Sequence, residues 1–202
     1  CDINSNSNNP VINLRAWGEE PETVKSLTCA FQRGVSRSKM LTCAKHFPGH
    51  GNSEVDSHLD LPEIRNDLSE LEKFELIPFI SLINQGVNSV MIGHLLFSKI
   101  DPIYPATLSK RLVTDLLRIK LNYDGLVVSD ALVMNAISNK YGSGESAVKA
   151  FDAGIDLIMM PKDIDEAINS LTDAFYSEKI SLKRLQISRE RRKKQLALIS
   201  NE

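Results

Sequence analysis

The chain has 202 residues, of which 42% are hydrophobic and 25% are charged, and its formal net charge is −2. Such a composition is typical of a globular protein with one sizeable core. The near-zero charge gives no reason to expect nucleic acid or an anionic membrane as a partner, and no apolar run is long enough to span a bilayer. Short apolar runs instead alternate with longer amphipathic stretches, which is the pattern of an α/β protein.

The predicted elements follow one another regularly along the chain. Four brief, continuously apolar runs predict buried strands, at 40–44, 88–92, 125–129 and 155–160. Helical spacing of apolar residues predicts helices over 21–34, 68–86, 107–121, 143–153, 163–176 and 181–199. Ser109 is the expected N-cap of the third helix, and Gly86 is the expected C-cap of the second. The alternation implies a parallel sheet of right-handed βαβ units.

Ionisable residues stand where the predicted strands end. Lys45 and His46 follow the first strand, His94 follows the second and Asp130 follows the third. The carboxyl ends of parallel strands share one edge, which is the active-site face of a (β/α)₈ barrel or of an open α/β sheet. No glycine-rich phosphate loop follows any strand, which argues against a nucleotide-binding sheet.

The number of strands predicts only part of a barrel. A complete (β/α)₈ barrel needs about 250 residues, whereas this chain shows four strands and a further strand that would end at 1–4. We therefore expect residues 1–180 to form a TIM-type barrel that lacks its first two βα units. Residues 181–202 are expected to form a basic C-terminal helix.

Three cysteines, Cys1, Cys29 and Cys43, are odd in number and lack CxxC spacing. They predict no disulfide framework and favour a reducing compartment. Cys43, in an apolar run, is expected to be a small buried side chain. No signal-peptide pattern is visible, so a cytoplasmic location is expected, with a lipid-modified Cys1 as the alternative.

The segment KHFPGHGNSEVDSH at 45–58 is the strongest candidate for chemistry. Asp56 and His58 are two residues apart and point the same way in an extended segment, so the carboxylate can accept from the imidazole Nδ1 and leave Nε2 for acid–base work. The alternative is a solvated loop in which Asp56 caps a turn. A metal site would use His46, His50, His58 and Asp56, but no helical ligand pair sets its geometry and Lys45 would repel a cation.

Two further residues complete the candidate set. Asp130 is a candidate nucleophile or electrostatic stabiliser, and its alternative role is the N-cap of a following helix. Arg15 follows the asparagine-rich loop CDINSNSNNP, where the alternative is an ordinary surface arginine.

The pattern at 45–58, KHFPGHG followed by any four residues and then DSH, resembles the signature of the β-N-acetylglucosaminidase branch of glycoside hydrolase family 3. The stretches DINSNSNNPVINLRAWGEEPE, SVMIGH, PATLSKRLVTDLLR, YDGLVVSDAL and AGIDLIMMP resemble further parts of the same family, in the same order. The resemblance covers residues 1–180.

The resemblance implies a retaining glycosidase that removes terminal β-linked N-acetylglucosamine from a small carbohydrate substrate, without a metal or organic cofactor. Asp130 falls at the nucleophile position, His58 at the acid/base position and Asp56 at the position of its orienting partner. The substrate-binding or pocket-lining positions are those of Arg15, Lys45, His46 and His94.

The chain departs from the family in one respect, because no acidic DxEGGR-like stretch precedes the motif. Whether this chain is active by itself is therefore open. The alternatives are a β-glycoside phosphorylase of the same branch, an inactive remnant that binds sugar, and a metal-dependent hydrolase. The sequence does not indicate an oligomeric state.

Overall fold

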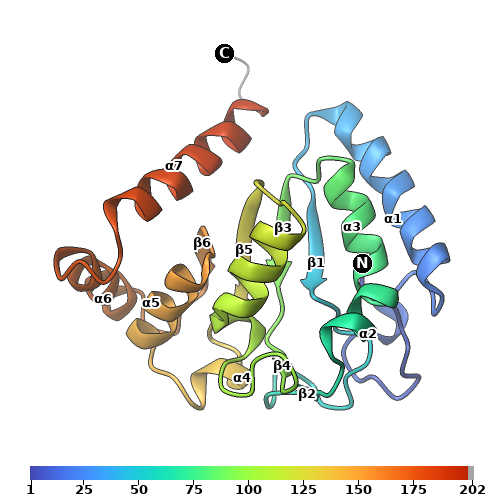
Figure 1. Ribbon diagram of the computed structural model, residues 1–202, viewed down its shortest axis with the longest axis horizontal. Coiled ribbons are helices and arrows are strands. Elements are labelled where there is room, and N and C mark those ends of the chain that lie inside the picture. Colours follow the sequence, from blue (N-terminus) through green and yellow to red (C-terminus); the bar gives the residue numbers. More distant parts are fainter. Residues whose placement is uncertain (200–202) are drawn as a thin grey trace.

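The computed structural model describes residues 1–199, and its centre is a parallel sheet (Figure 1). The strands follow the order β1 (Cys43–Phe47), β3 (Ser89–Ile92), β5 (Leu126–Ala131) and β6 (Leu157–Met159). Val90 in β3 is in register with Ala44 in β1 and with Val127 in β5. A second, two-stranded parallel sheet joins β2 (Glu63–Ile64) to β4 (Leu96–Phe97).

Helices connect the strands of the main sheet, as the βαβ pattern predicts. The longer ones are α1 (Pro21–Val35), α2 (Leu68–Lys73), α3 (Leu76–Asn84), the π-helix η4 (Arg111–Lys120), α4 (Asn135–Ser138), α5 (Ser143–Ala153), α6 (Ile164–Tyr176) and α7 (Leu182–Ala197). Three 3₁₀ turns complete the set: η1 (Asn13–Arg15), η2 (Ser36–Ser38) and η3 (Ala106–Leu108). None of these described helices is long and apolar enough to cross a membrane.

The α/β class with a parallel sheet is thus confirmed, and β1 and β6 are the edge strands of this sheet within residues 1–199. These four strands do not themselves close, so the (β/α)₈ barrel remains a prediction. Neighbours in the chain are also neighbours in the sheet, which is the order that a barrel requires.

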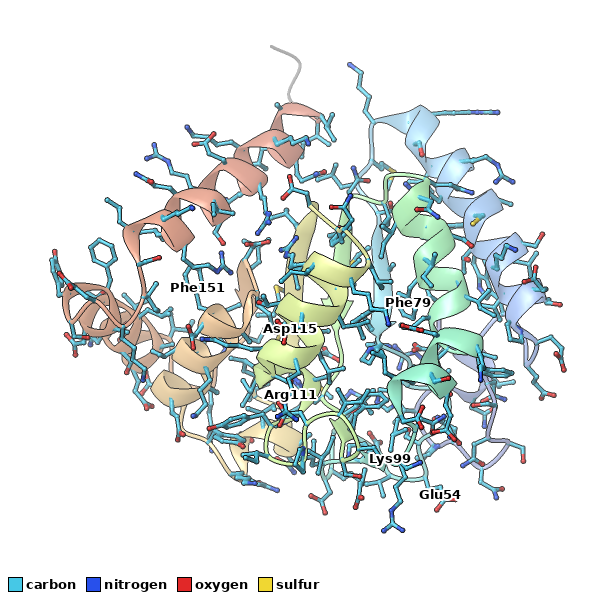
Figure 2. The ribbon with its side chains drawn as sticks, in the orientation of Figure 1. Glu54, Phe79, Lys99, Arg111, Asp115 and Phe151 are labelled. Atoms are coloured by element: carbon cyan, nitrogen blue, oxygen red, sulfur yellow. The ribbon has the colours of Figure 1, made fainter. Side chains whose placement is uncertain are left out.

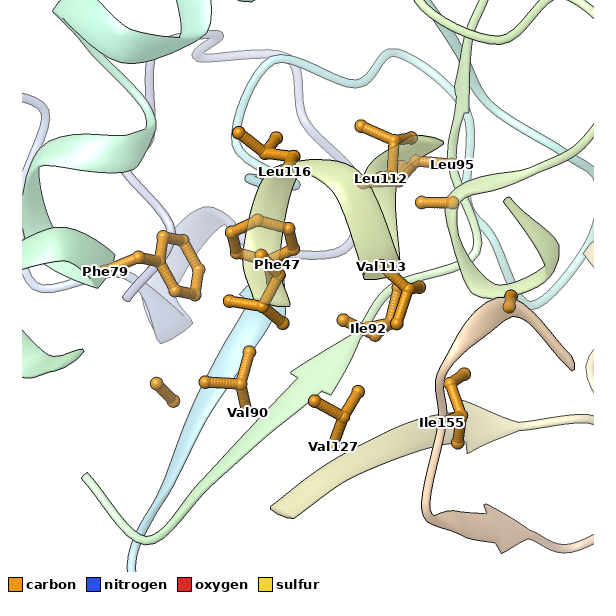
Figure 3. Close-up of a cluster of buried hydrophobic side chains, with 14 of the residues drawn as sticks. Phe47, Phe79, Val90, Ile92, Leu95, Leu112, Val113, Leu116, Val127 and Ile155 are labelled. Carbon is orange, nitrogen blue, oxygen red and sulfur yellow. The ribbon is translucent and has the colours of Figure 1, made fainter. Parts of the chain in front are cut away.

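The core lies between the sheet and the helices that cover it (Figure 3). Phe47 at the end of β1 meets Phe79 of α3 edge-on, with 5.4 Å between ring centroids. Val90, Val127 and Ile155 lie next to them in the same cluster, and all five side chains are fully buried. Each such side chain contributes about 1.5–3 kcal/mol of hydrophobic stabilisation.

The first strand lies further along the chain than the sequence predicts. It covers Cys43–Phe47 rather than 40–44, so Lys45 and His46 lie inside it. Its residues alternate between exposed and buried, and the expectation of a buried Cys43 is wrong because this side chain is on the exposed face. Residues 1–4 form no strand. They lie beside β1, where the amino group of Cys1 donates to the carbonyl of Lys45 at 2.7 Å.

The helix predicted over 68–86 is two helices, α2 and α3, that meet at Phe74 and Glu75. Pro78 lacks an N–H and therefore fits only the first turn of a new helix. Gly86 follows the end of α3 with a φ of +75°, which confirms the predicted C-cap. Ser109 lies two residues before η4 and accepts a hydrogen bond from the Leu112 N–H at 3.3 Å.

The C-terminal helix α7 leans across the end of the sheet opposite the loops that carry the candidate site (Figure 1). Residues 200–202 of the predicted 181–202 segment lie outside the described residues. The basic run is not wholly solvated, because Arg184, Ser188 and Arg191 of α7 all approach the buried carboxylate of Asp156. Arg118 of η4 completes the cluster at 2.5 Å.

Candidate active site at the carboxyl ends of the strands

Most of the predicted site residues lie at or beyond the carboxyl ends of β1, β3 and β5: His46, Asp56, His58, His94 and Asp130. Arg15 lies in η1, and Lys45 lies in the middle of β1. The loops after these strands occupy the lower part of Figure 1, together with β2, β4 and α4. Figure 2 shows Glu54, from the loop after β1, and Lys99, from the loop after β4, at this lower rim. The parallel sheet therefore gathers residues distant in sequence at one edge, as expected.

His46 is held by Asp2, a residue that sequence reasoning did not single out. The Asp2 carboxylate lies 2.8 Å from His46 Nδ1 and also accepts from the backbone N–H groups of His46, at 3.1 Å, and His50, at 2.8 Å. Burial would raise the pKa of Asp2, but the charge and hydrogen bonds of His46 outweigh it and hold that pKa well below its usual value. Asp2 is therefore an ionised carboxylate in the interior.

The other nitrogen of His46 faces the candidate nucleophile. His46 Nε2 lies 3.9 Å from Asp130 Oδ2 at the end of β5. The Asp130 side chain is 21% exposed, and the N–H of its neighbour Ala131 is the one donor to its Oδ1 within residues 1–199, at 2.8 Å. Asp2, His46 and Asp130 thus form a continuous line from the interior to an accessible carboxylate.

His94 lies beside this line but makes its contacts with protein groups. Its Nε2 donates to the Ala131 carbonyl at 3.0 Å, and its Nδ1 lies 2.7 Å from the Thr107 hydroxyl. The side chain is fully buried, and burial lowers the pKa of His94. Both nitrogens are occupied, so this geometry favours support of the Asp130 segment over direct contact with a ligand.

Asp56 and His58 form the pair that their spacing predicts. Asp56 Oδ1 lies 2.7 Å from His58 Nδ1 and accepts the backbone N–H of His58 at 2.8 Å. Slight burial raises the pKa of Asp56, but the two contacts with His58 outweigh this and lower it overall. The His58 side chain is 59% exposed, and its Nε2 makes no hydrogen bond within residues 1–199. Among residues 1–199, no hydrogen bond or ion pair connects this pair to Asp130.

Arg15 and Lys45 lie on a separate cleft of about 370 Å³ between α1, β1 and the N-terminal segment. Asp2 also lines this cleft, so it is the residue common to both parts of the site. Arg15 donates to the Val11 carbonyl at 3.4 Å and is otherwise exposed, as is Lys45. The two cations are near each other but have no contact with Asp130 among the described residues.

The four side chains that a metal site would use, those of His46, His50, His58 and Asp56, all make hydrogen bonds to other protein groups. No group of three or more histidine, cysteine, aspartate or glutamate side chains within residues 1–199 is arranged to hold an ion. His46 and His58 instead each hold a carboxylate at Nδ1, and the two ring nitrogens of His50 hydrogen-bond to the hydroxyls of Ser53 and Ser57. Sequence reasoning missed Asp2 as a site residue. The available signal was that it stands in residues 1–4, where a strand was expected to end and where ionisable residues mark the site edge.

Comparison with known proteins identifies the family of the chain. The sequence profile described as Glycosyl hydrolase family 3 N terminal domain matches residues 1–194. The chain is 34% identical over 211 residues to beta-hexosaminidase A of Pseudoalteromonas piscicida, which covers 94% of this chain and 35% of that protein. A glycoside hydrolase family 3 beta-N-acetylglucosaminidase from Paenibacillus sp. str. FPU-7 superposes with a TM-score of 0.92 at 43% identity, covering 98% of this chain and 38% of that one.

The same architecture occurs in a protein described as a phosphorylase. The beta-glucoside phosphorylase BglX superposes with a TM-score of 0.92 at 25% identity, over 98% of this chain and 38% of that chain. This chain thus spans little more than a third of the length of each of these relatives. Because the family profile matches nearly the whole chain, the chain belongs to glycosyl hydrolase family 3.

Proposed function

We propose that the protein is a retaining glycoside hydrolase that removes terminal β-linked N-acetylglucosamine through a covalent glycosyl–Asp130 intermediate. His58, oriented by Asp56, is the acid/base in this proposal. The substrate class follows the named relatives, and the residue roles follow the geometry. The sheet is proposed to be one side of a (β/α)₈ barrel, whose mouth is the strand edge that carries the site.

The observation that carries the proposal is the Asp56–His58 pair. The carboxylate lies 2.7 Å from Nδ1, so the ring is fixed and its other nitrogen is exposed. A carboxylate at one imidazole nitrogen orients the ring and favours its protonation, which suits proton transfer at the other nitrogen. A histidine that merely solvated a loop would not need this partner.

Asp130 is the second catalytic group of the proposed reaction. Its carboxylate would attack the anomeric carbon while His58 gives a proton to the departing glycosidic oxygen. In the second half, His58 would take a proton from water, the water oxygen would bond to the anomeric carbon, and the bond to Asp130 would break. Two displacements retain the configuration at that carbon.

His46, Lys45 and Arg15 are proposed to bind sugar hydroxyls. His46 Nε2 is directed toward the side of Asp130, and the two cations lie on the neighbouring cleft. Charge-assisted hydrogen bonds from such groups would orient the sugar over the nucleophile. His94 is proposed to support the segment that carries Asp130, through its bond to the Ala131 carbonyl.

A phosphorylase is the second candidate. A histidine acid/base without its proton is uncharged, and it therefore repels an incoming phosphate less than a carboxylate would. The resemblance to BglX supports the same possibility. In that case phosphate, not water, would accept the sugar.

The test measures release of phenol from an aryl β-N-acetylglucosaminide by the wild-type protein and by Asp130→Ala. We expect a loss of more than about 10²-fold with an unchanged melting temperature, and partial recovery on addition of azide, which replaces the lost carboxylate. Product analysis with phosphate present separates the two candidates, since only a phosphorylase yields the sugar phosphate. A variant that keeps over a tenth of the rate, a loss under about 1.4 kcal/mol, would refute the role of Asp130.

A further inference from the structure

A buried polar cluster lies beneath the loop that carries the acid/base pair. Its members are Asn9, His50, Ser53 and Ser57, and each is at most 2% exposed. Asn9 Nδ2 donates to the carbonyls of His50 and Gly51, at 2.8 and 3.0 Å, and to the Ser53 hydroxyl at 3.2 Å. The proposed reaction uses none of these side chains.

His50 occupies the centre of the cluster. Its Nδ1 lies 2.9 Å from Ser53 Oγ and its Nε2 lies 2.9 Å from Ser57 Oγ. Burial lowers the pKa of His50, which favours the neutral ring, with one donor nitrogen and one acceptor nitrogen. A hydroxyl can satisfy either nitrogen because it both donates and accepts.

The backbone of His50 is fixed as firmly as its ring. Its N–H donates to Asp2 at 2.8 Å, and its carbonyl accepts from Asn9. Gly51, the next residue, packs so closely on the Ile3 carbonyl that an added Cβ would lie 1.6 Å from that oxygen. His50 is therefore attached to the same carboxylate that holds His46.

Ser57 lies between Asp56 and His58 in the sequence. The remaining hydrogen bonds of residues 56–58 are local: His58 contacts Asp56, and the N–H groups of Leu59 and Asp60 donate to the Asp56 carbonyl at 2.9 and 3.0 Å. Within residues 1–199, the Ser57–His50 contact is thus the only hydrogen bond that ties residues 56–58 to another part of the chain.

We propose that His50 is a positioning residue, which holds the Asp56–His58 pair at the strand edge through its hydrogen bond to Ser57. The inference rests on the proposed function, because it assigns a purpose to the placement of the acid/base. Asp2 would then be the common support of both halves of the site. It contacts His46 beside the nucleophile and, through the His50 backbone, the link to the acid/base.

The cluster offers a matched pair of variants. Ser57→Ala removes the link to the acid/base loop, whereas Ser53→Ala removes an equally short contact of the same imidazole on its other side. Both delete one buried hydroxyl, but Ser53 also accepts from Asn9 and donates to the His50 carbonyl at 3.1 Å, so Ser53→Ala should lose at least as much global stability. Only Ser57→Ala should loosen the acid/base pair.

Amide hydrogen exchange tests the link without any sugar. Ser57→Ala should speed exchange of the Leu59 and Asp60 amides at least about tenfold relative to the wild-type protein, and Ser53→Ala should leave them within about twofold. In a His50→Leu background, Ser57→Ala should speed the exchange of these amides little further, because the imidazole that Ser57 contacts is already absent. Equal exchange in the two serine variants would overturn the inference, whatever the activity.

Kinetics then test the consequence for catalysis. Ser57→Ala should slow cleavage of a natural disaccharide about 10- to 100-fold, because a displaced proton donor loses much of its effect. It should scarcely change the rate with a dinitrophenyl leaving group, which needs no proton, and Ser53→Ala should affect neither substrate selectively. If only Ser57→Ala speeds exchange of the Leu59 and Asp60 amides and the protein has no glycosidase activity, the link would be supported and the proposed function refuted. If the same exchange result comes with equal losses of rate on the two substrates in Ser57→Ala, the positioning role would be refuted.

Discussion

Asp2 and His46 are 44 residues apart in sequence, and the carboxylate Oδ2 of one lies 2.8 Å from Nδ1 of the other in the interior. The same carboxylate accepts the backbone N–H groups of His46 and His50. One buried charge thereby fixes both the ring that faces Asp130 and the start of the loop that carries Asp56 and His58. Loss of this charge should disturb stability as well as chemistry.

Asp2→Asn should lower the free energy of unfolding by about 3 kcal/mol at pH 7, because it removes a buried carboxylate that accepts from His46 and His50 and places an amide NH₂ against backbone donors. Urea denaturation measures this difference. Asp60→Asn is the control, since Asp60 is exposed and accepts only the N–H of Leu61. A loss as small as that of Asp60→Asn would show that the Asp2 charge is dispensable.

The difference between wild type and Asp2→Asn should depend on pH. The folded-state pKa of Asp2 is held well below its ordinary value of 3.8, so the ionised form stabilises the fold fully above 3.8. As pH falls from there through the folded-state pKa, this contribution is lost. Urea titrations should therefore give a constant difference between pH 5 and 7 and a shrinking one below about pH 4. A difference that grows on acidification would contradict the assignment.

The role of His58 should depend on the leaving group. His58→Ala should slow cleavage of a natural disaccharide by about 10²–10⁴-fold and change the glycosylation rate with dinitrophenolate little, since that group departs without a proton. Asp56→Ala should show a milder form of the same pattern because the imidazole remains. Steady-state and burst kinetics with both substrates provide the measurement. Equal losses on the two substrates would instead indicate a structural or metal-binding histidine.

Dialysis against a chelator should leave activity and melting temperature unchanged. His46 and His58 each direct Nδ1 at a carboxylate, Asp2 and Asp56 respectively, in pairs suited to proton transfer and sugar binding. Metal content by mass spectrometry, before and after dialysis, completes the measurement. Stoichiometric zinc that is lost together with activity would overturn the glycosidase interpretation of this loop.

Asp156→Ala should destabilise the protein by about 3–5 kcal/mol, because it leaves the buried Arg118 guanidinium without its partner. Burial already lowers the pKa of Arg118 to about 10, and removal of Asp156 takes away the main opposing charge. Hydrogen exchange should also rise along α7, which Asp156 holds through Arg184 and Ser188.

Asp124→Ala is the matched control for Asp156→Ala. Asp124 pairs with Arg191 at 2.8 Å, but its side chain is 76% exposed, and an exposed ion pair contributes at most about 1 kcal/mol. The amides of α7 should therefore stay protected from hydrogen exchange in this variant. Comparable losses of unfolding free energy in Asp124→Ala and Asp156→Ala would show that burial of the Asp156 cluster does not determine its contribution to stability.

The sequence by itself determined what depends on neighbouring residues. The helix predicted over 143–153 is observed as α5 with the same ends, because a 3.6-residue apolar period and a glycine on each side are local signals. The Asp56–His58 contact was likewise predictable, since a spacing of two suffices to bring the side chains together. The edge occupied by His46, His94 and Asp130 followed from strand order alone.

Only the tertiary structure decided which distant groups meet. Nothing in the apolar pattern indicates that Asp2 would pair with His46, or that His50 would contact the serine inside DSH. The shift of the first strand to Cys43–Phe47 has the same origin, because its ends are set by hydrogen bonds to β3. Arg184 and Arg191 belong to a run that favours solvent by composition, yet Asp156 draws them inward. Periodicity encodes which face of an element is buried, whereas the partner of a buried charge depends on how the whole chain closes around it.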